Sequence, residues 1–120
     1  ISLMSTTSSK ATRVLIVDDH PMTRDGLMHL INREPDLEVA WEAENAAQAL
    51  EIAVAEQPDL ALVDITLPDK SGIDLIKDLK AVRPELKVLV ISMHEESLYA
   101  ERALRAGARG YITKQEGGAK

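Results

Sequence analysis

The sequence contains no cysteine and no phenylalanine, and aromatic residues make up only 2% of it. The lack of cysteine excludes disulfides as a source of stability and suits a reducing compartment, so we expect a cytoplasmic protein. With so few aromatic side chains, the core has to be built from Leu, Ile, Val and Ala. A chain of 120 residues is long enough for one such core and too short for two, so we expect a single domain.

Long hydrophobic runs are also missing, which argues against a membrane helix or a signal peptide. The formal net charge of −6 has the wrong sign for a domain that binds nucleic acid through its own surface. Residues 1–12 are rich in Ser and Thr and show no sustained period, so we expect a disordered tail there and a folded domain over 13–120.

What the sequence does have is a series of short aliphatic runs that alternate with helical patterns. Runs of four apolar residues rich in β-branched side chains are typical of strands buried on both faces, and hence of a parallel sheet. The expected strands are residues 14–17, 60–63 and 88–91, with weaker ones at 37–41 and 109–113.

The segments between these runs carry apolar residues at helical spacing. The stripes contain Leu27, Leu30 and Ile31, then Leu50, Ala53 and Val54, then Ile73, Ile76, Leu79 and Val82, and finally Ala100, Ala103, Leu104 and Gly107. Pro21 suits an early helix position, and Gly107 suits the left-handed residue after a helix. The pattern predicts an α/β fold in which a five-stranded parallel sheet has helices on both faces.

Polar side chains follow the expected strands at the edge where ligands bind in such sheets. These residues are Asp18, Asp19, Asp64, Ser92 and Lys114. Clustered carboxylates repel one another, so their convergence indicates a bound cation, and hard oxygen ligands favour Mg²⁺.

Taken singly, each of these residues has an ordinary structural interpretation. Asp19 could cap a helix, Ser92 could lie in a turn, and Lys114 could be a solvated surface charge. The functional interpretation rests on their coincidence, because four of five strands deliver a polar group of the required kind to one edge.

These residues also resemble a known family. The string Val17-Asp18-Asp19-His20, then Asp64 with Pro68 and Gly72 at intervals of four, then Ser92, and Gly110-Tyr111-Ile112 before Lys114 are similar to the receiver domain of bacterial two-component response regulators. The resemblance runs from about Arg13 to Lys114. It implies a flavodoxin-like, doubly wound sheet with strand order 2-1-3-4-5.

The resemblance implies a role for each site residue. Asp64 would take a phosphoryl group from a sensor histidine kinase. Asp19, Asp64 and the backbone carbonyl of Thr66 would bind Mg²⁺ directly, and Asp18 would bind it through water. Ser92 and Lys114 would contact the phosphoryl oxygens.

A conformational switch is implied as well. Ser92 would move inward on phosphorylation, and Tyr111 would rotate into the space that Ser92 leaves. For Tyr111 the alternative is an amphipathic surface residue.

The strings around Ser92 and Lys114 look most like the NarL/FixJ-type branch, which carries a LuxR-type helix-turn-helix after the receiver. A C-terminal DNA-binding output domain is therefore an expected partner. Receivers end in a further helix, and residues 115–120 are too short for one, so we expect that helix to be largely missing here. An apolar sheet face left uncovered would favour self-association.

Two alternatives stay open. Haloacid-dehalogenase-type phosphatases also combine an Asp nucleophile, Ser or Thr, Lys and Mg²⁺, but their nucleophile closes the first strand, and Thr66 here stands where their second Asp would be. A degenerate receiver would act only as a binding module. We expect no enzyme in the ordinary sense, only self-catalysed phosphoryl transfer to and hydrolysis from Asp64.

Overall fold

The computed structural model describes residues 11–65, 67–92 and 97–113. Strands and helices alternate along these residues, as the hydrophobic runs predicted, and both of the weaker strands are present. The elements are β1 (Thr12–Val17), α2 (Pro21–Asn32), β2 (Leu37–Ala43), α3 (Ala46–Glu56), β3 (Leu60–Asp64), α4 (Gly72–Val82), β4 (Lys87–Ser92), α5 (Ser97–Ala106) and β5 (Gly110–Thr113).

All strand pairs are parallel, and the sheet order is β2-β1-β3-β4-β5. The order of the first four strands, with a helix between successive strands, agrees with the sequence-based prediction. β1 begins at Thr12, one residue before the predicted start of the domain, because the Thr12 amide donates to the Asp36 carbonyl at 2.8 Å. The predictions for residues 1–10 and for a missing last helix after Lys114 lie outside the described residues.

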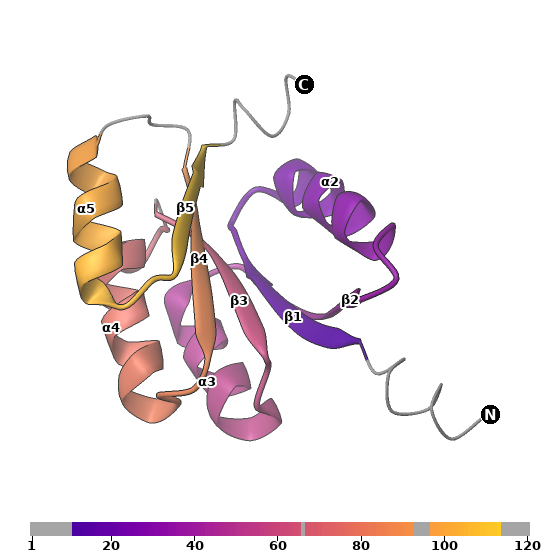
Figure 1. Ribbon diagram of the computed structural model, residues 1–120, viewed down its shortest axis with the longest axis horizontal. Coiled ribbons are helices and arrows are strands. Elements are labelled where there is room, and N and C mark those ends of the chain that lie inside the picture. The colour runs from indigo at the N-terminus through magenta and orange to yellow at the C-terminus, as the bar shows by residue number, and fades with distance from the viewer. Residues whose placement is uncertain (1–10, 66, 93–96, 114–120) are drawn as a thin grey trace.

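One face of the sheet is covered by α3, α4 and α5 (Figure 1). Its core is aliphatic, as the composition required, and Leu75, Ile76 and Leu79 of α4 are fully buried there. In α3 the buried positions are alanines, among them Ala49 and Ala53, whose small side chains let that helix pack close to the sheet.

The opposite face is covered, within the described residues, by α2 alone (Figure 1). Its buried members are Val14, Ile16, Leu62 and Ile91. The α2 side chains that pack against them are only partly buried, and α2 has no fully buried residue. This face is therefore less completely covered than the other.

The helical stripes were wrong at one residue in each helix. Leu30, Val54, Val82 and Leu104 are between 43% and 55% exposed. Each of these four residues lies at one side of its stripe. The buried residues of α3 include Ala49 and Ala53, and those of α4 include Leu75, Ile76 and Leu79. Apolar character at helical spacing identified the helices but not the width of their buried faces.

Gly107 follows α5 with φ of +121°, the left-handed conformation that the sequence predicted for it. Pro21 stands at the start of α2, as expected. Across the described residues, no helix combines the length and apolar character needed to cross a membrane.

Candidate functional site

The three carboxylates predicted to meet at the edge of the sheet come from two neighbouring strands. Asp18 and Asp19 follow β1, and Asp64 is the last residue of β3. These strands pair in parallel with Val17 opposite Val63, so their carboxyl ends lie side by side. The ligand atoms of Asp18, Asp19, His20 and Asp64 all lie within 4.8 Å of one another.

The carboxylates differ in their access to solvent. Asp18 is 1% exposed and Asp64 is 4% exposed, whereas the side chain of Asp19 is 32% exposed. Buried carboxylates are costly unless positive charge or hydrogen-bond donors compensate them. The arrangement thus presents a compact acidic site with one open side, through Asp19.

His20 belongs to the same cluster, although sequence reasoning placed it in a motif without giving it a role. Its backbone amide donates to Asp18 Oδ1 at 2.9 Å. Its ring Nδ1 lies 3.2 Å from the same oxygen and 3.1 Å from Asp19 Oδ1. The ring is the exposed member of the group, at 60%. These contacts hold the two aspartates in a defined orientation.

Arg24 supports the loop after β1 from the first turns of α2. Its Nη1 donates to the backbone carbonyl of Asp18 at 2.7 Å, and its Nε donates to Glu42 Oε1 at 3.1 Å. The amide of Asp18 in turn donates to the Ala43 carbonyl at 3.0 Å. No sequence signal pointed to Arg24, because its contacts are to backbone and to a residue far along the chain.

The loop after Asp64 is fixed by backbone contacts at Gly72. The Gly72 amide donates to the carbonyl of Ile65 at 2.8 Å. A Cβ at position 72 would lie 2.6 Å from Ile65 Cα, closer than side chains approach backbone. Ser71 begins α4 as its N-cap, with its hydroxyl accepting from the Ile73 amide at 3.2 Å.

Asp69 ties the same loop to α3. Its carboxylate oxygens accept from the amides of Ala46 at 2.9 Å and Ala47 at 3.2 Å, at the N-terminus of that helix. These bonds favour the charged form, so the Ala46 amide above all lowers the pKa of Asp69 from its ordinary value of 3.8. Sequence reasoning did not identify this residue.

The donor set fits a hard divalent cation. Mg²⁺ takes oxygen ligands at about 2.0–2.1 Å, so two ligands on opposite sides of one ion lie about 4 Å apart. The ligand atoms of this cluster already approach that spacing. Small side-chain movements would therefore let the carboxylates share one ion, and its charge would relieve their mutual repulsion.

The structure describes some of the remaining predicted site residues but not all of them. Ser92 is the last residue of β4, the strand in which Ile91 pairs with Asp64, so its backbone lies at the same edge of the sheet. Thr113 pairs with Ser92 in β5, and Tyr111 belongs to that strand. Thr66 and Lys114 lie outside the described residues.

Comparison with known proteins decides what this arrangement is. The family model "Response regulator receiver domain" matches residues 14–120. The chain belongs to the response regulator receiver family. The family expected from the motifs is therefore confirmed, and the chain is not a conventional enzyme, which sets aside the haloacid-dehalogenase alternative.

Several of its curated relatives are named as transcription regulators. The chain is 35% identical over 103 residues to the transcriptional regulatory protein DegU of Brevibacillus brevis, covering 86% of this chain and 44% of that protein. It is 39% identical over 103 residues to the nitrate/nitrite response regulator NarL of Escherichia coli K12, covering 84% of this chain and 47% of that one. The receiver thus spans about half the length of these relatives, and the resemblance to NarL-type regulators is confirmed.

Solved structures of response regulators match the fold of this chain. A two-component response regulator of the LuxR family from Aurantimonas sp. SI85-9A1 matches with a TM-score of 0.84 and 36% identity, over 88% of this chain and 75% of the other. A response regulator from Burkholderia pseudomallei, solved with a phosphorylated aspartic acid, a calcium ion and citrate, matches with a TM-score of 0.76 and 29% identity, over 86% and 59%.

Proposed function

We propose that this receiver is a phosphorylation switch whose acceptor is Asp64. The observation that carries the proposal is that Asp64 ends a central strand within a compact cluster of carboxylates that can share a divalent cation. The phosphorylated aspartic acid and calcium ion in the relative from Burkholderia pseudomallei support the same chemistry.

The proposed reaction transfers a phosphoryl group from a phosphohistidine of a sensor histidine kinase. An oxygen of the Asp64 carboxylate attacks phosphorus, and an O–P bond forms as the N–P bond breaks. The electron pair of that bond goes to the imidazole nitrogen of the kinase, which takes up a proton. The product is an acyl phosphate on Asp64.

Four other residues would support this transfer. Asp19, Asp64 and the Thr66 carbonyl would hold Mg²⁺, and Asp18 would hold it through a water molecule. When bound, the ion supplies positive charge beside the phosphoryl oxygens. Lys114 would neutralise one of those oxygens.

The output of the switch would follow from Ser92 and Tyr111. The phosphoryl group brings about two negative charges and strong acceptors, so the Ser92 hydroxyl would move to donate to it. Tyr111 would then fill the vacated space. The DNA-binding transcriptional activator DevR/DosR of Mycobacterium tuberculosis, 38% identical over 102 residues, supports a DNA-binding output domain as the element controlled. The proposed place of action is the cytoplasm.

We further propose that this receiver self-associates through the sheet face next to α2. Within the described residues that face is covered by one helix with no fully buried side chain, and Leu60 and Leu89 remain partly accessible on it. Sedimentation velocity would show a dimer that dissociates in Leu89→Glu. A monomer at all concentrations would contradict the proposal.

Incubation with acetyl phosphate tests the main proposal. We expect a gain of one phosphoryl mass in the intact protein, dependent on Mg²⁺. A degenerate receiver would gain none.

A further inference from the structure

A basic groove lies between α4 and α5, outside the acidic site. It has a volume of about 570 Å³, within the range of sites that hold small ligands. Its lining residues are Ser71, Ile73, Asp74, Lys77, Arg102, Arg105 and Ala106. Three of these are cations and one is an anion, in a chain whose net charge is −6.

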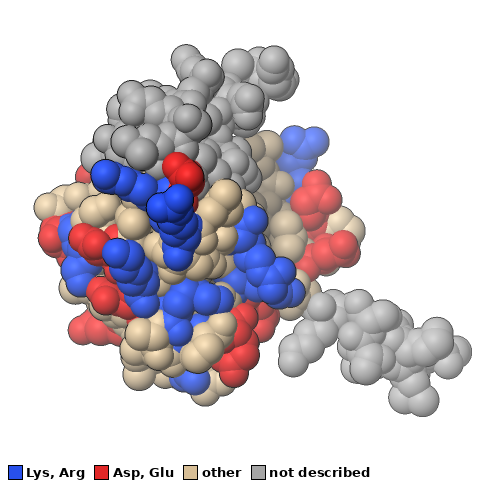
Figure 2. All heavy atoms as spheres, turned by 60° about the vertical axis from the view of Figure 1, so that its left-hand side comes forward, with Lys and Arg blue, Asp and Glu red and all other residues tan. Residues whose placement is uncertain are grey.

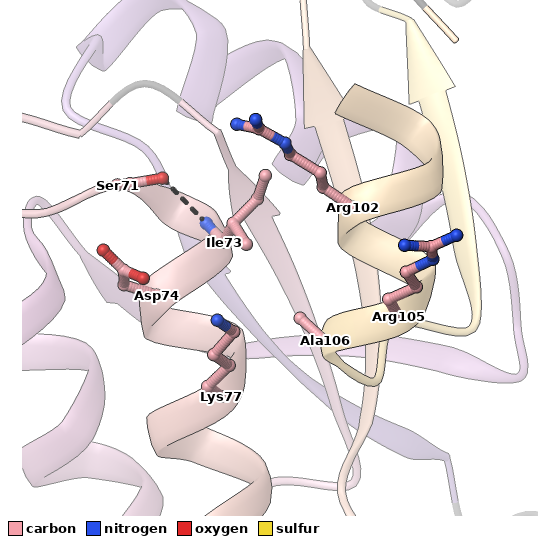
Figure 3. A pocket seen from close by; sticks show the side chains of 7 residues that line it. All are labelled: Ser71, Ile73, Asp74, Lys77, Arg102, Arg105 and Ala106. Carbon is pink, nitrogen blue, oxygen red and sulfur yellow. Dashed lines mark hydrogen bonds between the residues drawn. The ribbon is translucent and has the colours of Figure 1, made fainter. Parts of the chain in front are cut away.

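The charged lining residues come from two neighbouring helices, α4 and α5 (Figure 3). Asp74 and Lys77 are three residues apart on α4, and Ser71, the N-cap of that helix, precedes Asp74 by the same interval. Arg102 and Arg105 have the same spacing on α5, and the Arg102 guanidinium extends toward the N-terminal end of α4 (Figure 3). Ile73 and Ala106 also line the groove and provide an apolar floor.

The cations are available to a ligand. Within the described part of the chain, the side chains of Lys77 and Arg102 form no hydrogen bond or ion pair. Arg105 pairs with Glu101 at 3.2 Å, but both side chains are more than half exposed, and such pairs are weak in water. Figure 2 shows the molecule with the α4–α5 side turned forward, and Lys and Arg side chains gather across the middle of that view.

We propose that this groove binds an acidic polypeptide segment of a partner protein. Carboxylates of the segment would pair with Arg102, Arg105 and Lys77, and an apolar side chain would pack on Ile73. Arginine forms bidentate pairs with carboxylates, which gives such a contact direction as well as charge.

The composition of the groove favours a peptide over a nucleic acid. The presence of Asp74 among the cations, and of Glu101 beside them, would repel a continuous row of phosphates. The apolar floor suits a peptide side chain, whereas a phosphate backbone would leave it unused. The net charge of the domain opposes binding of a long polyanion but tolerates a short segment with a few carboxylates.

A labelled peptide tests the proposal. The probe is a fluorescein-labelled ten-residue peptide of Glu and Leu, compared with the same peptide in which Gln replaces Glu and with a labelled DNA duplex. We expect the Glu peptide to bind best, with an affinity that falls as salt rises. Backbone amide shifts should change in residues 71–77 and 101–106.

Matched variants decide whether the groove is responsible. In Arg102→Gln/Arg105→Gln we expect binding to weaken by about two- to thirtyfold, because the two lost exposed charge pairs together are worth roughly 0.4–2 kcal/mol. Arg33→Gln/Lys87→Gln removes the same charge from exposed positions outside the groove and should bind as the parent does. Lys77→Gln, on the other helix, should also weaken binding, which keeps the test informative if the first variant unfolds.

Any of five outcomes would overturn the proposal, of which the first four concern a peptide that binds. These four are equal losses in the groove and control variants, equal binding of the Gln peptide, stronger binding of the duplex, and amide shifts confined to another surface. Absence of any binding by the Glu peptide would overturn it too.

Discussion

The backbone carbonyl of Asp64 occupies the space that a side chain at position 72 would need. A Cβ there would lie 3.1 Å from the carbonyl carbon of Asp64 and 2.6 Å from Ile65 Cα. The start of α4 therefore packs directly on the backbone that carries the proposed acceptor. This contact gives the spacing between Asp64 and Gly72 a physical reason, because only glycine allows the approach.

Replacing this glycine should destabilise the domain and disturb the acceptor. In Gly72→Ala the backbone has to move, which costs about 1–3 kcal/mol of unfolding free energy. Gly26→Ala is the matched control, because position 26 lies in α2 with nothing within 4 Å of its added Cβ, and it should stabilise by roughly 0.5–1 kcal/mol. Urea denaturation of both variants checks this, and similar stabilities would contradict it.

Asp69 should make stability depend on acidity. The folded protein lowers the pKa of Asp69, so its contribution is complete above the unfolded chain's pKa of about 3.8 and is lost as the pH falls through the lower folded value. Asp69→Ala should therefore cost more stability at pH 7 than at pH 3. The control is Asp36→Ala, an exposed aspartate outside the site. If denaturation curves show that Asp69→Ala loses the same unfolding free energy at both pH values, the hydrogen bonds from the two amides to the charged carboxylate do not account for the stability that Asp69 contributes.

Magnesium should stabilise the protein through Asp19. Binding to the folded state alone adds about 2.7 kcal/mol when the free ion is about 100 times its dissociation constant. Asp19→Asn should lose most of this gain, and in EDTA it should be at least as stable as the parent because one repelling charge is gone. Thermal melts with Mg²⁺ and with EDTA measure both effects. An unchanged Mg²⁺ response would remove Asp19 from the ligand set.

Much of the fold was predictable because its signals are local. Four aliphatic residues in a row identified each buried strand, and the parallel arrangement then placed Asp18, Asp19 and Asp64 at one edge. The exposed Leu30, Val54, Val82 and Leu104 were not predictable, since their burial depends on how far each helix sits from the sheet. The buried alanines let α3 pack close to the sheet, and the spacing of apolar residues in the sequence does not reveal that distance.

The residues that support the site could not be predicted either, because their contacts also depend on how distant parts of the chain pack. Arg24 contacts the Asp18 carbonyl, and Asp69 contacts two amides of α3 that lie 23 and 22 residues away in the chain. Contacts to backbone leave no constraint on the partner's side chain, so no pattern of residue types records them. Asp18, Asp19 and Asp64 were found because several polar residues follow strands that end at the same edge of the sheet, and that coincidence is visible in the sequence.

The identity of the phosphorylated residue tests the account most directly. Borohydride reduces an acyl phosphate on aspartate to homoserine, which peptide mass spectrometry locates. After treatment with acetyl phosphate and Mg²⁺, we expect homoserine at position 64, the same result in the control Asp59→Asn, and none in Asp64→Asn. Homoserine at Asp18 or Asp19, or an undiminished phosphoryl adduct in Asp64→Asn, would contradict the account.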